Sequence, residues 1–168
     1  MNYFSTYDSP LGELVLAAND GALTGLWMAG QRFFASGLPS NSIKGTNDVL
    51  KEAECWLDSY FAGERIELGD IPIQMQGTPF QKEVFELIAQ IPYGCFVTYG
   101  DLASDIAHKR GITKMSAQAI GGAVGHNPIS IIVPCHRVLA AGGKLGGYGG
   151  GLENKRFLLR LEGIDFIE

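Results

Sequence analysis

The change from strand-like to helix-like patterning along the chain constrains the fold more than any other feature. The first 28 residues contain three apolar runs separated by turn sequences such as Asn19-Asp20-Gly21, which predicts strands joined by tight turns. The range 30–47 is rich in Gly, Ser, Asn and Pro and predicts a loop. We therefore expect an α/β (α+β) fold, with a small α/β domain over 1–76 and a mainly helical domain over 77–168.

Helix signals occur in five segments. The range 48–62 has an apolar face of helical spacing. The segment 78–81, with the sequence Thr-Pro-Phe-Gln, combines a capping box with a proline at the first helical position. The other helices are expected from Thr98, over 116–125 and over 152–162. The helix from Thr98, the basic turn that follows it and the helix over 116–125 together predict a helix-turn-helix.

The helix over 116–125 consists almost wholly of small residues, with Gly121 and Gly122 near its centre. Each glycine costs a helix about 1 kcal/mol relative to alanine, so a close approach by another backbone should compensate. Two kinds of approach are open. The helix packs tightly inside the protein, contacts a nucleic-acid groove, or does both.

A cysteine follows the most apolar run of the second half. The range 129–133 predicts a buried strand, and Cys135 lies just past its end, after Pro134 and before His136. The thiolate is the reactive form of cysteine, and nearby cations or imidazoles favour it by lowering the thiol pKa from about 8.5. His136 and Arg137 are candidates for that role. The alternative is a buried structural cysteine, because free cysteine is among the most buried residue types.

Cysteine usage and hydropathy exclude several classes of protein. The three cysteines lie far apart, with no CxxC and no paired histidines nearby, which argues against a metal site or a disulfide scaffold and predicts a cytoplasmic protein. No stretch approaches the roughly 18 to 20 apolar residues of a membrane span, so no membrane partner is expected. Nothing in the sequence suggests a stable oligomer, and we expect a monomer.

The net charge of −5 is unevenly distributed along the chain. Residues 1–76 carry a net charge of −6, whereas residues 77–168 carry +1. Between 105 and 162, eight basic groups face only three acidic ones. A nucleic-acid-binding protein needs a local basic face rather than a basic average. The second half is therefore compatible with DNA binding.

The residues around Cys135 resemble the O6-alkylguanine-DNA alkyltransferases. The segment 134–138, Pro-Cys-His-Arg-Val, matches the signature of that family, and the match continues through the glycine-rich loop over 142–151 to 161–163. Upstream, Thr98-Tyr99, the range 119–123 and Asn127-Pro128 also fall where the family has them. The resemblance covers residues 77–168. The first part is similar only in kind, as a ribonuclease-H-like α/β domain.

This resemblance implies a DNA-repair protein. An alkyl group would pass from the O6 atom of guanine, and possibly from O4 of thymine, to Cys135. The transfer would be irreversible, so each molecule would act once and need no cofactor. The partner would be double-stranded DNA containing O6-alkylguanine, with the damaged nucleotide flipped out of the duplex, because the reacting atom is inaccessible within the base stack.

The resemblance also implies roles for individual residues. Cys135 would be the nucleophile, and His136, oriented by Glu162, would remove its proton through a water molecule. Tyr99 would donate a proton to the leaving guanine, and Asn127 would tie the turn to the active-site strand.

Other matching residues would bind the substrate. Tyr148 would line the base pocket together with the backbone around Val138 and Gly149. The residues expected to contact DNA are Ser116, Gln118, Ala119, Gly121, Gly122 and Arg137.

Gln118 departs from the family pattern, which usually has an arginine that fills the gap left by the extruded nucleotide. We therefore expect weaker DNA binding or slower repair than in a Gln118→Arg variant. Gly149, where many members have a serine, is a lesser departure that would widen the pocket toward larger adducts.

Two alternatives are weighed against repair. One is an alkyltransferase-like protein that binds lesions without repairing them, and the other is a cysteine-based redox or hydrolase domain.

Overall fold

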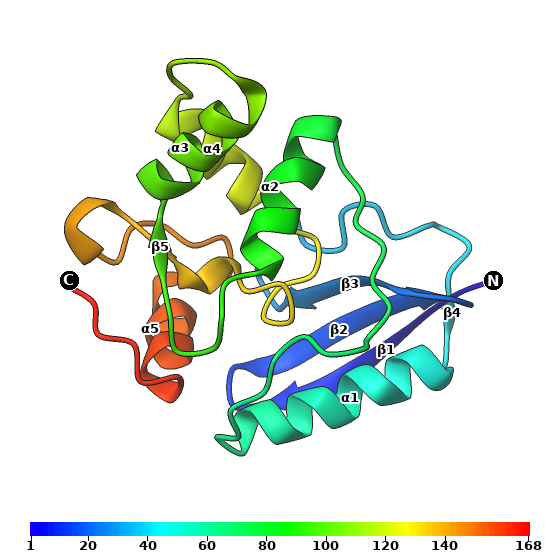
Figure 1. Ribbon diagram of the computed structural model, residues 1–168. Helices are drawn as coiled ribbons and strands as arrows, with labels where there is room; N and C mark the ends of the chain where they lie inside the picture. The colour runs from blue at the N-terminus through cyan, green and yellow to red at the C-terminus, as the bar shows by residue number, and fades with distance from the viewer.

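Three antiparallel strands open the fold, as the turn sequences predict. The computed structural model describes all 168 residues. A fourth, short strand pairs parallel with the first, so the sheet order is β3-β2-β1-β4. One helix covers a face of this sheet (Figure 1). The elements of this part are β1 (Asn2–Ser9), β2 (Gly12–Asn19), β3 (Leu23–Met28), β4 (Ile43–Lys44) and α1 (Asp48–Phe61).

The predicted helix starts of the second part are confirmed. Thr78 and Thr98 each form a capping box, and the Ser116 side chain accepts a hydrogen bond from the amide of Ala119. None of the helices has the length and apolar character needed to span a membrane. The elements are α2 (Pro79–Ala89), β5 (Val97–Thr98), α3 (Tyr99–Arg110), α4 (Ala117–Gly125), β6 (Val138–Leu139) and α5 (Leu152–Leu161).

A short connection joins α3 to α4, so the predicted succession of helix, turn and helix is present. Gly111 ends α3 in the left-handed conformation, with φ +66°, which a glycine adopts without steric cost. The two helices contact each other and α2. In Figure 1 these three helices lie together, beyond the β3 edge of the sheet.

The strand predicted over 129–133 is not formed, and this segment is a turn. The Asn127 side chain accepts a hydrogen bond from the Ile129 amide and donates to the carbonyls of Ile129 and Val133. Such local side-chain bonds offer the backbone an alternative to a sheet ladder. Ile131 adopts a φ of +69°, which is rare for a β-branched residue. The apolar run is therefore buried as a turn rather than as a strand.

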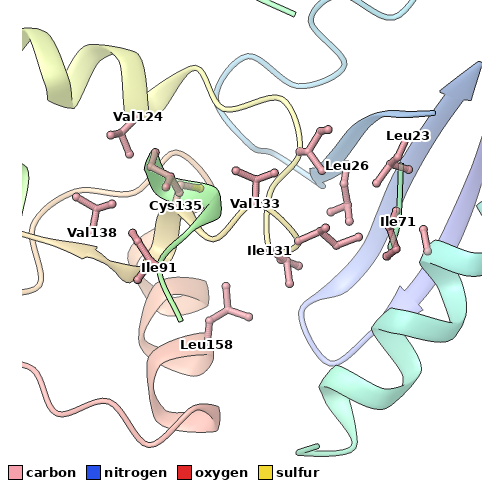
Figure 2. Packing of buried hydrophobic residues seen from close by; sticks show 14 of the residues in the cluster. Leu23, Leu26, Ile71, Ile91, Val124, Ile131, Val133, Cys135, Val138 and Leu158 are labelled. Atoms are coloured by element: carbon pink, nitrogen blue, oxygen red, sulfur yellow. The ribbon is translucent and has the colours of Figure 1, made fainter. Parts of the chain in front are cut away.

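This turn is attached to the N-terminal sheet. The Leu26 amide of β3 donates to the Pro128 carbonyl at 2.8 Å, and the Ser130 amide donates to the Leu26 carbonyl at 3.0 Å. One buried apolar cluster continues from the sheet through Ile131 and Val133 to Cys135 (Figure 2). The division into domains over 1–76 and 77–168 stays a prediction, since both parts share this core.

Candidate active site

Cys135 begins a single 3-10 turn, Cys135–Arg137, that leads into β6. The residue is 6% exposed and lines a cavity of about 260 Å³. The turn held by Asn127 precedes it, and Asn127 lines the same cavity. The local sequence thus positions the sulfur at the junction of two tight turns, at the end of the shared core.

Besides the turn that contains Asn127 and Cys135, four parts of the chain form the walls of this cavity. Tyr99 comes from α3, and the glycine-rich loop contributes Tyr148 with its glycine neighbours. From α4 the lining includes Gly121, Val124 and Gly125. Gln31 and Arg32 come from the first part of the chain. Sequence reasoning missed these last two residues, because they lie in a loop that carries no motif.

Burial raises the pKa of the Cys135 thiol, and nearby Asn127, Tyr148 and Lys155 partly oppose this effect. The residues expected to lower this pKa, His136 and Arg137, are not among the groups that shift it. Both turn toward Glu162 instead. The thiol is consequently protonated at neutral pH, and a base must remove its proton before the sulfur can react.

Glu162, the residue that ends α5, accepts hydrogen bonds at both oxygens. Its Oε1 accepts from Arg137 Nε at 2.7 Å and from the Gly94 amide at 3.1 Å. Its Oε2 accepts from the Tyr60 hydroxyl at 2.6 Å and contacts His136 Nε2 at 2.5 Å. Burial alone would raise the pKa of Glu162, but His136 and Arg137 outweigh it and lower the pKa to about 2. Glu162 is therefore a carboxylate at any pH near neutral.

His136 is fully buried, and burial lowers its pKa. The ring is therefore neutral at pH 7, and because the carboxylate can only accept, Nε2 carries the hydrogen. This tautomer leaves a lone pair on Nδ1. Only two buried side-chain polar atoms in the protein lack a hydrogen-bond partner, His136 Nδ1 and the Tyr148 hydroxyl. The site thus contains an unoccupied proton acceptor in the residue next to Cys135.

The structure corrects the roles expected for Arg137 and Val138. Arg137 is 4% exposed and donates from Nη1 to the Ile91 carbonyl at 2.6 Å, in addition to pairing with Glu162. Its predicted contact with DNA is therefore wrong. Val138 does not line the cavity. Its carbonyl accepts from Lys155 Nζ at 2.8 Å, behind the site.

Lys155 is a further residue whose part in the site the sequence did not reveal. It is fully buried, and its ammonium donates to the carbonyls of Val138 and Gly147. Burial lowers the pKa of Lys155 to about 8, against the opposing influence of Cys135. Lys155 thereby fixes the glycine-rich loop to the strand that follows Cys135.

The predicted DNA-contacting residues of α4 lie on its surface. Ser116, Gln118, Ala119 and Gly122 are exposed. A Cβ atom at Gly121 would lie 3.9 Å from the Tyr99 ring, and one at Gly122 would meet nothing within 4 Å. Tight internal packing therefore does not account for the two glycines.

Tyr99 and Asn127 both line the cavity with Cys135. Tyr99 is half-buried, with its hydroxyl 3.4 Å from the Gly147 carbonyl, and burial together with Cys135 raises its pKa. The phenol therefore keeps its proton at neutral pH and can act as a donor. Asn127 binds the Val133 carbonyl at 2.8 Å, two residues before Cys135, although the segment it ties down is a turn.

Two protein-family models match the chain. "6-O-methylguanine DNA methyltransferase, ribonuclease-like domain" matches residues 2–75, and "6-O-methylguanine DNA methyltransferase, DNA binding domain" matches residues 79–164. The fold and the site therefore define a class of proteins in which a ribonuclease-like domain is followed by a DNA-binding domain that contains a buried cysteine.

Relatives match over nearly the whole chain. "Methylated-DNA--protein-cysteine methyltransferase" of Mycobacterium tuberculosis is 43% identical, covering 96% of this chain and 93% of its own length. The protein of the same name from Methanosarcina acetivorans is 39% identical, covering 96% and 98%. The crystal structure of "Mycobacterium tuberculosis OGT in complex with DNA" has a TM-score of 0.82 at 42% identity, covering 95% and 92%. The chain belongs to the 6-O-methylguanine DNA methyltransferase family.

Proposed function

We propose that this protein repairs alkylated DNA by transferring the alkyl group from the O6 atom of guanine to Cys135. The observation that carries the proposal is the unpaired Nδ1 of His136, a residue that is held by Glu162 and directly follows the only buried cysteine of the chain. A soft nucleophile that lines a cavity and a neutral base in the next residue, both of them buried, suit the displacement of an alkyl group.

The reaction is a single displacement. His136 Nδ1 takes the thiol proton through a water molecule, and the thiolate attacks the alkyl carbon. A carbon–sulfur bond forms as the carbon–oxygen bond breaks, and the electron pair passes to the guanine. Tyr99 donates a proton to the guanine, and the proton on His136 returns to the phenol through solvent. The products are S-alkylcysteine and unmodified guanine.

The DNA partner is proposed to be a duplex from which the alkylated nucleotide is flipped into the cavity. Exposed Gly122, with open space around it, supports close contact between α4 and DNA. Ser116, Gln118 and Ala119 would contribute to this contact. Tyr148 and Gly149 would border the base. O4-alkylthymine is a second possible substrate, because it presents a similar alkylated oxygen. We propose that the protein acts as a cytoplasmic monomer.

A protein that only binds lesions is not favoured. Such a protein needs no nucleophile or base, whereas Cys135, His136 and Glu162 are all present and His136 is bonded to Glu162. A redox role is not supported either, since Cys55 and Cys95 are both exposed while Cys135 is buried.

Intact-protein mass spectrometry tests the proposal. The protein is incubated with a duplex carrying one O6-methylguanine, and we expect its mass to increase by one CH₂ unit. Cys135→Ala should show no increase, while Cys95→Ala, which removes an exposed thiol, should show the same increase as the parent protein. An unchanged mass with selective binding to the damaged duplex would overturn repair in favour of lesion binding.

A further inference from the structure

The loop between β3 and β4, residues 29–42, forms the outer wall of the cavity from the first part of the chain. The Arg32 amide donates to the Gly149 carbonyl at 2.9 Å, which joins this loop to the glycine-rich loop. The Gln31 side chain accepts from the Met28 amide at 2.9 Å and from the Ser130 hydroxyl at 3.2 Å. The segment that presents Arg32 is therefore fixed to both parts of the chain.

Two residues of this loop adopt a backbone conformation that is rare outside glycine. Phe33 has φ +59° and Ala35 has φ +54°. Phe33 is held by its ring, which stacks on His126 at the end of α4 with centroids 4.0 Å apart. Unfavourable backbone conformations that persist through surrounding contacts concentrate at functional sites. The strained part of the loop adjoins the cavity, directly after Arg32.

Arg32 differs from every other arginine of the protein. It is exposed, and it is the only charged residue that lines the cavity. Its guanidinium lies 5.0 Å from the centre of the Phe33 ring and has no hydrogen-bond or ion-pair partner. The five arginines that do have such partners are Arg65, Arg110, Arg137, Arg156 and Arg160.

Arg32 lies near the C-terminal end of α4, where a cation can favour the binding of an anion. The C-terminal end of a helix carries a partial negative charge, which repels an anion. His126 and Gly125, at that end of α4, lie against Phe33 and Gly149. In the proposed complex the flipped nucleotide enters beside this end of α4, because Gly125 lines the cavity, and its phosphates come with it. A guanidinium offsets the repulsion and suits a phosphate, because its planar donors match the phosphate oxygens.

We propose that Arg32 binds a phosphate next to the flipped nucleotide, at the opposite end of α4 from Gln118. This inference rests on the proposed function, since it assigns one contact of the DNA substrate. It also places a positive charge at the cavity in a chain that has Gln118 where its family usually has arginine.

Salt-dependent binding provides the test. Dissociation constants for a duplex with one O6-methylguanine are measured over a series of salt concentrations, in a Cys135→Ala background that cannot be alkylated at this residue. Loss of one phosphate contact should reduce the slope of log K against log salt by about 0.9. For Arg32→Gln we expect this reduction, together with about tenfold weaker binding, as for loss of a hydrogen bond to a charged group.

Two further variants control for charge and for structure. Arg32→Lys keeps the charge and should retain most of the slope. Arg160→Gln removes an equal charge at the end of α5, outside the cavity lining, and should leave the slope unchanged. Equal slopes and affinities for Arg32→Gln and its parent would overturn the proposal. A lower melting temperature with an unchanged slope would assign Arg32 to the stability of the loop and would also overturn it.

Failure of the proposed function would look different. In that case the protein with Cys135 intact would gain no mass from the methylated duplex, whatever the effect of Arg32 on salt-dependent binding.

Discussion

The inner end of the cavity and its mouth are built in opposite ways. Behind Cys135, the buried Glu162 carboxylate accepts a hydrogen bond from Tyr60. The side chains of His136 and Arg137 are buried against the same carboxylate and contact it. At the mouth, Arg32 and the exposed residues of α4 have few partners. The difference separates two requirements. Proton transfer needs groups fixed in one geometry, whereas binding a long polymer needs groups that are free until it arrives.

The largest effect should follow removal of the central carboxylate. In Glu162→Gln the buried charge of Arg137 loses its counter-charge, and breaking one partner of a buried ion pair costs about 3–5 kcal/mol. Urea denaturation should show this loss in the free energy of unfolding. Methyl transfer should slow by about a hundredfold or more, because the base is no longer oriented.

A surface carboxylate provides the matched control. The Glu153 side chain is 94% exposed and pairs with Arg156 on the same helix. Glu153→Gln should change the free energy of unfolding by about 0–1 kcal/mol. Equal effects of the two substitutions would contradict the distinction between the inner end and the surface.

Acid should weaken the inner end within a defined pH window. The pKa of Glu162 is lowered in the folded protein from 4.5 to about 2, so the unfolded chain binds the proton more readily. The stabilisation by Glu162 is therefore fully present above pH 4.5 and is lost as the pH falls toward 2, on the order of 3 kcal/mol. Urea midpoints should fall across this window in the parent protein, and less steeply in Glu162→Gln. If the urea midpoints of the two proteins fall in parallel, Glu162 is not the group whose protonation destabilises the fold in acid.

Removing one donor from the carboxylate should have a smaller effect. Tyr60→Phe deletes the hydroxyl that donates to Glu162 at 2.6 Å in the buried site, and a hydrogen bond to a charged group contributes about 1.5–3 kcal/mol. Tyr7→Phe removes a similar bond, from Tyr7 to Asp58 at the surface, and should cost less. Thermal unfolding of both variants compares them. A larger loss for Tyr7→Phe would show that burial does not strengthen the Tyr60 bond.

The smallest effect on stability is expected at the mouth. Gln118→Arg adds a cation on the exposed face of α4 and should change the free energy of unfolding by less than about 0.5 kcal/mol. It should tighten binding to methylated duplex and speed transfer, measured by titration and by the rate of mass gain. If neither affinity nor rate increases, an arginine at this position is not needed in this protein.

Local rules predicted much of this fold. The helix starts at Thr78, Thr98 and Ser116 depend on a few neighbouring residues, and their signals were clear. The strand expected over 129–133 does not form, because the Asn127 side chain makes hydrogen bonds with the backbone of this segment. The apolar pattern of the sequence does not predict these bonds.

The site was predictable only in part, for a related reason. The motif identifies Cys135 and His136, but adjacency in sequence does not say which way a side chain points. The sequence therefore predicts a DNA contact for Arg137 and not its ion pair with Glu162. Tyr60 reaches Glu162 across 102 residues. Arg32 belongs to a loop without any pattern, and only the folded chain brings it to the cavity.

The backbone bonds from β3 to the turn before Cys135 couple the two parts of the molecule. A part that contributes no reacting atom nevertheless holds the reactive turn through Leu26 and the carboxylate through Tyr60. Substitutions in the sheet should therefore alter the reactivity of Cys135. Because these hydrogen bonds and the core join the two halves, neither half should unfold alone. The whole chain should unfold in one cooperative transition.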